Sequence, residues 1–105
     1  MNSRPTVEQV WTALRGVEDP EFPLSLVDMG MIYDARVDGS EVNIDMTFTS
    51  IGCPAIDMLT ADVRDAVGEL DGVEVVNVHV VWDPPWVKDR ISKSGRRVLA
   101  AHGVV

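Results

Sequence analysis

The 105-residue sequence contains a single cysteine, Cys53. One cysteine excludes an internal disulfide, and the lack of a Cys-x-x-Cys pair excludes thioredoxin-type dithiol exchange. A Cys-x5-Arg phosphatase loop is excluded because Leu59 stands six residues after the cysteine. The sequence also lacks a glycine-rich phosphate loop, a signal peptide and a membrane-spanning stretch. We therefore expect a protein of the cytoplasm that has no membrane partner.

Basic residues are also scarce: the sequence has 9 lysines and arginines but 17 acidic residues, which gives a net charge of −8. This balance argues against binding to nucleic acid. The charge is uneven, because residues 1–87 carry 16 acids and 4 bases, whereas residues 88–105 carry 1 acid and 5 bases. We expect the basic tail to pack on its own acidic body. The alternative is a tail that binds a partner.

The chain length predicts one domain over residues 1–105, with a core large enough to need no disulfide or metal. Thr6 and Gln9 have capping-box spacing at the start of a helix that we expect to reach about Gly16. Strands are predicted over 31–38 and 41–48, joined at Asp38-Gly39, a strong hairpin signal. In the second of these strands, apolar residues alternate with Asn43, Asp45 and Thr47, which predicts one polar face open to solvent.

Helical periodicity returns over residues 54–70, and a β-branched run over 73–82 predicts a third strand. A short basic helix is expected over 92–102. The order helix, strand, strand, helix, strand, helix predicts an α+β domain of two layers, with the helices packed on one face of a small sheet. The sheet is mixed if the third strand pairs beside the second. Its free edge makes a homodimer plausible.

Cys53 lies where the second strand gives way to the second helix, within the segment Thr49-Ser50-Ile51-Gly52-Cys53-Pro54. Pro54 suits the first helical position, which makes Cys53 the expected N-cap. The positive end of the helix would favour the thiolate, the form that attacks electrophiles and binds metal. A buried structural cysteine is the alternative, and the flanking glycine and proline lead us to favour function.

One thiolate supplies one ligand, whereas tetrahedral iron and zinc sites need about four. A monomer therefore cannot hold a stable all-cysteine cluster. A dimer would bring two Cys53 thiolates, and a partner protein or small thiol could supply the rest. This reasoning permits handling of iron or of a labile cluster without establishing it.

Other candidate residues have ordinary structural explanations. The two prolines of residues 19–23 make a rigid turn, in which Asp19 and Glu21 are solvated, cap the next turn or point into a site. Trp82 and Trp86 flank a proline-rich turn that either packs on the sheet end or exposes a binding surface. His79 is expected to be a cross-strand residue, since no second histidine or cysteine has metal-site spacing.

Four motifs together resemble the iron–sulfur assembly family that contains SufT and PaaD and shares the fold of the NifU C-terminal domain. In order they are Asp19-Pro20-Glu21, the segment 27–33 (VDMGMIY), the segment 47–54 (TFTSIGCP) and the segment 81–86 (VWDPPW). The resemblance implies a non-enzymatic role in maturing iron–sulfur proteins, with client or other assembly proteins as partners. It also implies that Cys53 is the functional cysteine and metal ligand, with Thr49, Asp19 and Glu21 beside it.

Two departures limit the resemblance. PaaD proteins carry a cysteine-rich, zinc-binding extension and NifU domains carry Cys-x-x-Cys, whereas this sequence has one cysteine. A general assembly factor is therefore expected, with no tightly bound cofactor in the monomer. Two alternatives stay open: a thiol enzyme with Cys53 as nucleophile, and an adaptor that docks through Trp82, Trp86 and the basic C-terminal helix.

Overall fold

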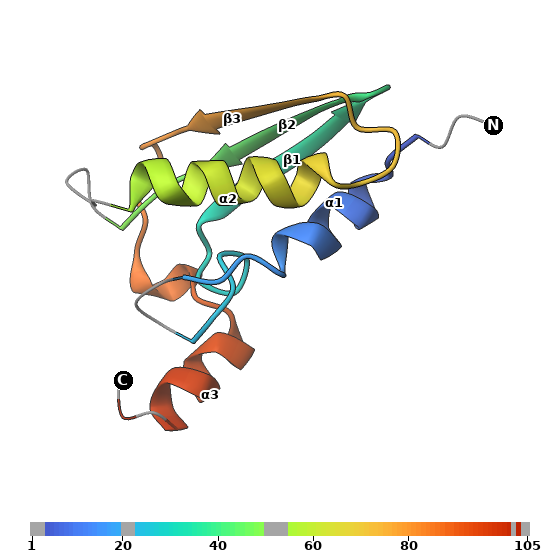
Figure 1. Cartoon of the computed structure of the whole chain (residues 1–105). Helices are drawn as coiled ribbons and strands as arrows, with labels where there is room; N and C mark the ends of the chain where they lie inside the picture. The colour runs from blue at the N-terminus through green and yellow to red at the C-terminus, as the bar shows by residue number, and fades with distance from the viewer. Residues whose placement is uncertain (1–3, 20–22, 50–54, 102, 104–105) are drawn as a thin grey trace.

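The computed structural model describes residues 4–19, 23–49, 55–101 and 103, and their elements follow the expected order (Figure 1). A short 3-10 turn, η1, precedes the last helix and is the one addition to that order among the described residues. The elements are α1 (Val7–Leu14), β1 (Ile32–Asp38), β2 (Glu41–Met46), α2 (Ile56–Gly68), β3 (Val75–Val80), η1 (Lys88–Arg90) and α3 (Lys93–Ala101).

The sheet has the order β1-β2-β3. β1 and β2 are antiparallel and meet at the predicted hairpin, where Gly39 has a positive φ of 62°. β2 and β3 are parallel, because α2 returns the chain to the end of the sheet at which β2 begins (Figure 1). The expected mixed sheet and α+β class are both confirmed.

The apolar residues that alternate along the second predicted strand point into the core. Val42, Ile44, Met46 and Phe48 are all buried, and α1 and α2 cover this face of the sheet (Figure 1). The apolar stripe of α2 packs here too, with Leu59, Val63 and Val67 buried. Burial of large apolar side chains of this kind supplies most of the driving force for folding.

The predicted start of α1 is confirmed in detail. The Thr6 hydroxyl accepts a hydrogen bond from the backbone N–H of Gln9, and the Gln9 side chain accepts one from the N–H of Thr6. This reciprocal pair is a capping box.

The start of α2 differs from the prediction. Its N-cap is Ala55 and its first residue is Ile56, so the placement of Cys53 at the N-cap is wrong by two positions. Cys53 and Pro54 themselves lie outside the described residues.

α3 extends beyond the two layers and is anchored on the segment 24–30 (Figure 1). The Ser92 hydroxyl donates to a carboxylate oxygen of Asp28 at 2.9 Å, and its backbone N–H donates to the Asp28 carbonyl at 2.8 Å. Gly95 is buried, and a Cβ built on it would lie 3.2 Å from Leu24. A larger residue at position 95 would require the side chains of Leu24 and Ile91 to shift.

The basic tail therefore packs on the body through polar and apolar contacts. Arg90 lies over the ring of Tyr33, 4.4 Å from its centroid, which is a cation–π contact. The one tail ion pair among the described residues joins Arg96 to Asp89, which belongs to the tail itself. The expected charge pairing between tail and body is not seen in this part of the chain.

Candidate functional site

The segment that carries Cys53 starts at the carboxyl end of β2, where several distant parts of the chain meet. The N–H of Thr47 donates to the carbonyl of Met31 at 2.8 Å, which ties the end of β2 to the entrance of β1. The N–H of Val81 donates to the carbonyl of Met46 at 2.8 Å, which ties it to the exit of β3. In an α/β arrangement the carboxyl ends of parallel strands are a common place for a functional site.

Two of the four residues predicted for the site lie within the described part of the chain. Thr49 is exposed just beyond β2. Asp19 is half-buried, and its N–H donates to the carbonyl of Leu24 at 2.8 Å, so residues 19 and 24 close the acidic turn at its base. Cys53 and Glu21 lie outside the described residues, and the four-residue site stays a prediction.

The two tryptophans that flank the proline-rich turn occupy different environments. Trp86 is half-buried, and its Nε1–H donates to the carbonyl of Met29 at 2.7 Å. Trp82 is 39% exposed, and its ring centroid lies 6.2 Å from that of the buried Phe48. Trp86 therefore packs the turn onto the body. Trp82 instead presents an aromatic surface next to the residue that precedes Thr49.

The sequence did not single out Thr47, which is fully buried and whose Oγ1 has no hydrogen-bond partner among the described residues. Alternation with Asn43 and Asp45 placed Thr47 on the polar face of β2. The prediction of an exposed residue is wrong here because β2 has already ended at Met46. A buried hydroxyl without a partner costs free energy, so this position is locally unfavourable. No local sequence signal could have revealed it.

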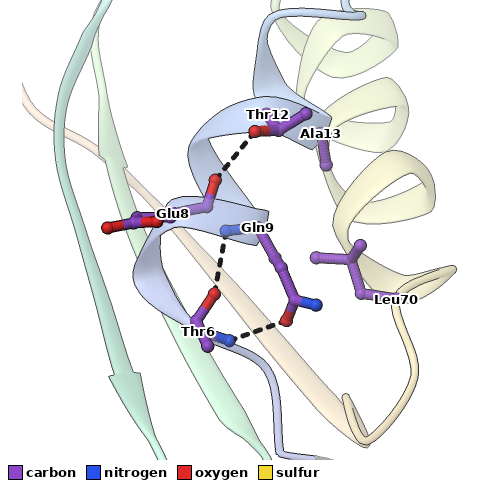
Figure 2. Close-up of a pocket in the computed structure, with 6 residues that line it drawn as sticks. All are labelled: Thr6, Glu8, Gln9, Thr12, Ala13 and Leu70. Carbon is purple, nitrogen blue, oxygen red and sulfur yellow. Dashed lines mark hydrogen bonds between the residues drawn. The ribbon is translucent and has the colours of Figure 1, made fainter.

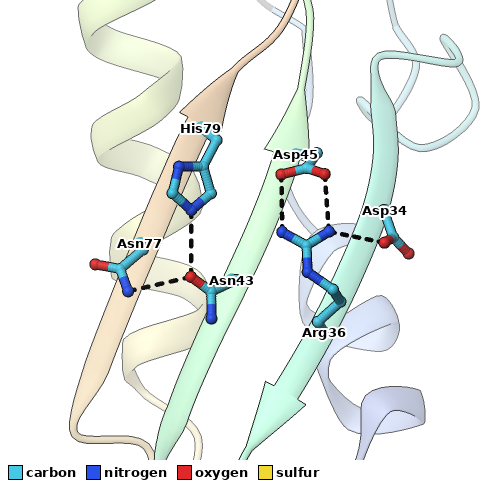
Figure 3. A network of polar contacts seen from close by, with 6 residues as sticks. All are labelled: Asp34, Arg36, Asn43, Asp45, Asn77 and His79. Atoms are coloured by element: carbon cyan, nitrogen blue, oxygen red, sulfur yellow. Dashed lines mark hydrogen bonds and ion pairs between the residues drawn. The ribbon is translucent and has the colours of Figure 1, made fainter.

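The uncovered face of the sheet carries a network of polar side chains, shown in Figure 3. Arg36 forms a bidentate pair with Asp45, at 2.8 and 3.1 Å, and a further 2.8 Å contact with Asp34. The hydrogen bond from Arg36 lowers the pKa of Asp45, and the same pair raises the pKa of Arg36. The carboxylate stays ionised, so this part of the network is an ion pair across two strands.

The other half of the network confirms the cross-strand prediction for His79. Nε2 of His79 lies 3.2 Å from Oδ1 of Asn43, which also accepts from Nδ2 of Asn77 at 3.2 Å (Figure 3). These residues are partners of one another, so they stabilise the sheet surface. Among the described residues, no group of three or more histidine, cysteine or acidic side chains is placed to hold a metal ion.

A shallow groove lies between α1 and Leu70, which stands two residues after the end of α2, as Figure 2 shows. Three of its polar side chains form hydrogen bonds within this region: Thr6 and Gln9 form the capping box, and the Thr12 hydroxyl donates to the carbonyl of Glu8 at 2.9 Å. The Glu8 side chain is exposed. The remaining lining residues are Ala13 and Leu70. The groove is remote from Thr49, because it lies at the opposite end of α2.

No helix within the described residues is long and apolar enough to cross a bilayer.

Comparison with known proteins then decides the family. The profile described as iron-sulfur cluster assembly protein matches residues 7–80, which span α1 to the end of β3. The chain belongs to this family. The resemblance carried by the four sequence motifs is thereby confirmed.

Curated members of the iron–sulfur cluster assembly family align over most of this chain. The Fe-S protein maturation auxiliary factor YitW of Bacillus subtilis is 37% identical, over 88% of this chain and 91% of that protein. The Fe-S protein maturation auxiliary factor SufT of Staphylococcus aureus is 36% identical, over 79% and 96%. A component of the putative 1,2-phenylacetyl-CoA epoxidase of Escherichia coli is 33% identical, over 95% of this chain but 61% of that protein.

Solved structures of similar proteins have the same fold. The domain of unknown function DUF59 from Bacillus anthracis superposes with a TM-score of 0.84, at 34% identity over 94% of this chain and 92% of that one. A Mycobacterium tuberculosis protein described as associated with Fe-S complex assembly and repair is 36% identical, with a TM-score of 0.55 over 93% and 86%.

Proposed function

We propose that this chain is an iron–sulfur protein maturation factor in which Cys53 binds or passes on iron or a cluster. The observation that carries the proposal is the position of the chain's one thiol. Cys53 follows β2 by seven residues, in the segment that leaves the meeting point of β1, β2 and β3. Membership of the iron–sulfur cluster assembly family supports the chemistry, because thiolates are the usual ligands of such clusters.

The neighbours of the thiol in the proposed site are Thr49, Asp19 and Glu21. Thr49 is exposed, so its hydroxyl is available to a cargo or a partner. The acidic turn is closed at its base by the hydrogen bond between residues 19 and 24. A carboxylate near the thiol would raise the thiol pKa, because it disfavours a second negative charge. This effect would keep binding weak and exchangeable, as transfer requires.

A single thiolate cannot complete a cluster site, so the proposal includes a source of further ligands. We propose a homodimer that contributes two Cys53 thiolates, or a client or assembly protein that contributes its own. The cargo is then released when one partner leaves, and no cofactor is tightly bound to the monomer. The compartment is the cytoplasm.

An adaptor is the second candidate, and the exposure of Trp82 is the observation that favours it. Trp82 lies beside Phe48 and presents its ring outward, as aromatic anchors of interfaces do. Trp86 is not part of this alternative, because it is held on Met29. The adaptor predicts that Trp82→Ala abolishes client maturation while Cys53→Ala is tolerated.

Anaerobic reconstitution with iron and sulfide tests the proposal on the wild type, Cys53→Ser and Trp82→Ala. Visible absorption reports the cluster, and sizing chromatography reports the oligomer that holds it. We expect a cluster band in wild type and Trp82→Ala that is absent in Cys53→Ser. Far-ultraviolet circular dichroism of Cys53→Ser should match the wild type, which separates loss of a ligand from loss of the fold.

Maturation of a client iron–sulfur enzyme in cells gives the second readout. We expect cells that carry Cys53→Ser to show low client activity at normal levels of the factor. Normal client activity in these cells would refute the role of the thiol. If Trp82→Ala alone were defective, the adaptor would replace the carrier as the function.

A further inference from the structure

Three carboxylates form a ridge along the solvent side of α2. Asp62, Asp65 and Glu69 are exposed and follow one another at intervals of three and four residues, which places them on one side of the helix. Met58 precedes them in the same row and is 48% exposed. None of the three carboxylates forms an ion pair with another described residue. We call these three residues the acidic ridge.

α3 presents the opposite charge to solvent. Lys93, Arg96 and Arg97 are exposed at positions i, i+3 and i+4, whereas Gly95 and Leu99 on the other side of the helix are buried. Arg96 donates to the Asp89 carbonyl at 2.9 Å and lies 3.8 Å from its carboxylate. Lys93 and Arg97 have no acidic partner among the described residues. We call these three residues the basic face.

One chain cannot bring its own two surfaces together. α3 is held on the segment 24–30 through Ser92 and Gly95, and it extends beyond the sheet layer on which α2 lies (Figure 1). The ridge and the face therefore remain separate patches of opposite charge in the monomer, and Arg96 is the one of their six residues with an ion-pair partner among the described residues. A second copy supplies the matching charge for both at once.

We propose that the chain forms a symmetric dimer in which the basic face of each copy docks on the acidic ridge of the other. A two-fold axis makes both contacts equivalent and closes the assembly, so three positive charges meet three negative charges twice. The inference rests on the homodimer of the proposed function and names its surface. It does not depend on what Cys53 binds.

Such an interface depends on salt, because its charges are exposed. Sedimentation equilibrium of the full chain at low and at high salt, about 50 mM and about 500 mM, measures this dependence. We expect the dimer dissociation constant to rise by at least about tenfold at the higher salt. A wild type that stays monomeric at millimolar concentration and low salt would overturn both this interface and the proposed homodimer.

Charge reversal identifies the surfaces. One variant carries Lys93→Glu, Arg96→Glu and Arg97→Glu, and the other carries Asp62→Lys, Asp65→Lys and Glu69→Lys. We expect each variant alone to be monomeric, because both of its contacts become repulsive. Mixed in equal amounts, the two variants should form a mixed dimer. In it the reversed face of one variant meets the reversed ridge of the other, and the unchanged face meets the unchanged ridge, so both contacts join opposite charges. An interface that uses neither the basic face nor the acidic ridge does not predict that rescue.

The matched control reverses three bases elsewhere, through Arg4→Glu, Arg15→Glu and Lys88→Glu, which are also exposed. This control alters net charge equally and should still dimerise at low salt with an unchanged salt dependence. Neutral versions with glutamine at the three tail positions replace the reversed variant if it fails to fold. A dimer whose dissociation constant is unaffected by salt and by all these substitutions would overturn the proposed interface alone. That result would assign the dimer to another surface, such as the free edge of β3.

Discussion

Nε1 of Trp86 donates a 2.7 Å hydrogen bond to the backbone carbonyl of Met29, 57 residues earlier in the chain. This bond joins the proline-rich turn after β3 to the turn that precedes β1. Tyr33 adds a second link, because its hydroxyl donates to the Pro84 carbonyl at 2.7 Å. The segment that carries Trp82 is thereby fixed beside the end of β2.

Trp86→Phe should destabilise the protein by about 1–3 kcal/mol, because the Met29 carbonyl loses its side-chain donor while remaining buried. Urea denaturation followed by circular dichroism measures the change. Trp82→Phe is the control, since Trp82 is exposed and phenylalanine keeps the ring contact with Phe48. We expect it to cost less than about 0.5 kcal/mol. Equal losses in the two variants would contradict the distinct roles of the tryptophans.

Gly30→Ala should be more damaging than Gly39→Ala, although both substitutions add a methyl group to a glycine with a positive φ. Gly30 has a φ of 73°, and a Cβ there would lie 2.3 Å from the carbonyl oxygen of Arg90. The matched control is Gly39→Ala, at a φ of 62° with no atom within 4 Å, which isolates the conformational cost of roughly 1 kcal/mol. We expect Gly30→Ala to exceed that cost by at least about 2 kcal/mol or to prevent folding, as thermal denaturation would show. Similar melting temperatures for the two variants would refute the close approach.

Thr47→Val should stabilise the fold by about 1 kcal/mol, because it replaces a buried hydroxyl that has no partner in the described part of the chain with a methyl group of the same shape. Thr60→Val is the matched control. Thr60 is also buried, but its hydroxyl donates to the Asp57 carbonyl at 2.9 Å, so its loss should destabilise. Opposite signs in chemical denaturation are the expected result. A loss of stability in Thr47→Val would mean that the Thr47 hydroxyl has a partner in solution.

Asp45→Asn should lower stability at neutral pH by less than about 1 kcal/mol, since the ion pair with Arg36 lies at the surface. Arg36 lowers the pKa of Asp45 below its ordinary value of 3.8. The stabilisation is therefore present above pH 4 or so and disappears as the pH falls through the lowered pKa. Acid titration of wild type and variant should converge below that point. Asp38→Asn, at an exposed carboxylate that ends β1 and has no ion-pair partner among the described residues, is the control and should leave the stability at neutral pH unchanged.

Much of the fold follows from local patterns in the sequence. The capping box of Thr6 and Gln9, the hairpin at Gly39 and the alternation of Val42 to Phe48 each involve residues close in the chain. Such signals need no knowledge of distant segments, so the elements and their order could be predicted. The start of α2 was predicted two residues too early, because proline and glycine mark the entrance of a helix without setting its first residue.

The candidate site was predicted less completely, because its surroundings come from distant segments. Cys53, Thr49, Asp19 and Glu21 were singled out by type and by resemblance to the family. The burial of Thr47 and the different environments of the two tryptophans could not be predicted. Each depends on which segment covers it, and that segment lies tens of residues away.

The sequence by itself determined the class of fold, the family and the one thiol available for chemistry, since composition, periodicity and motif order are properties of the chain alone. Tertiary structure decided that β3 pairs with β2, that Trp86 is held on Met29, and that α3 stands apart from α2. The physical reason is that these contacts depend on packing between segments far apart in the chain. Local propensity carries no information about which distant surface a residue will meet.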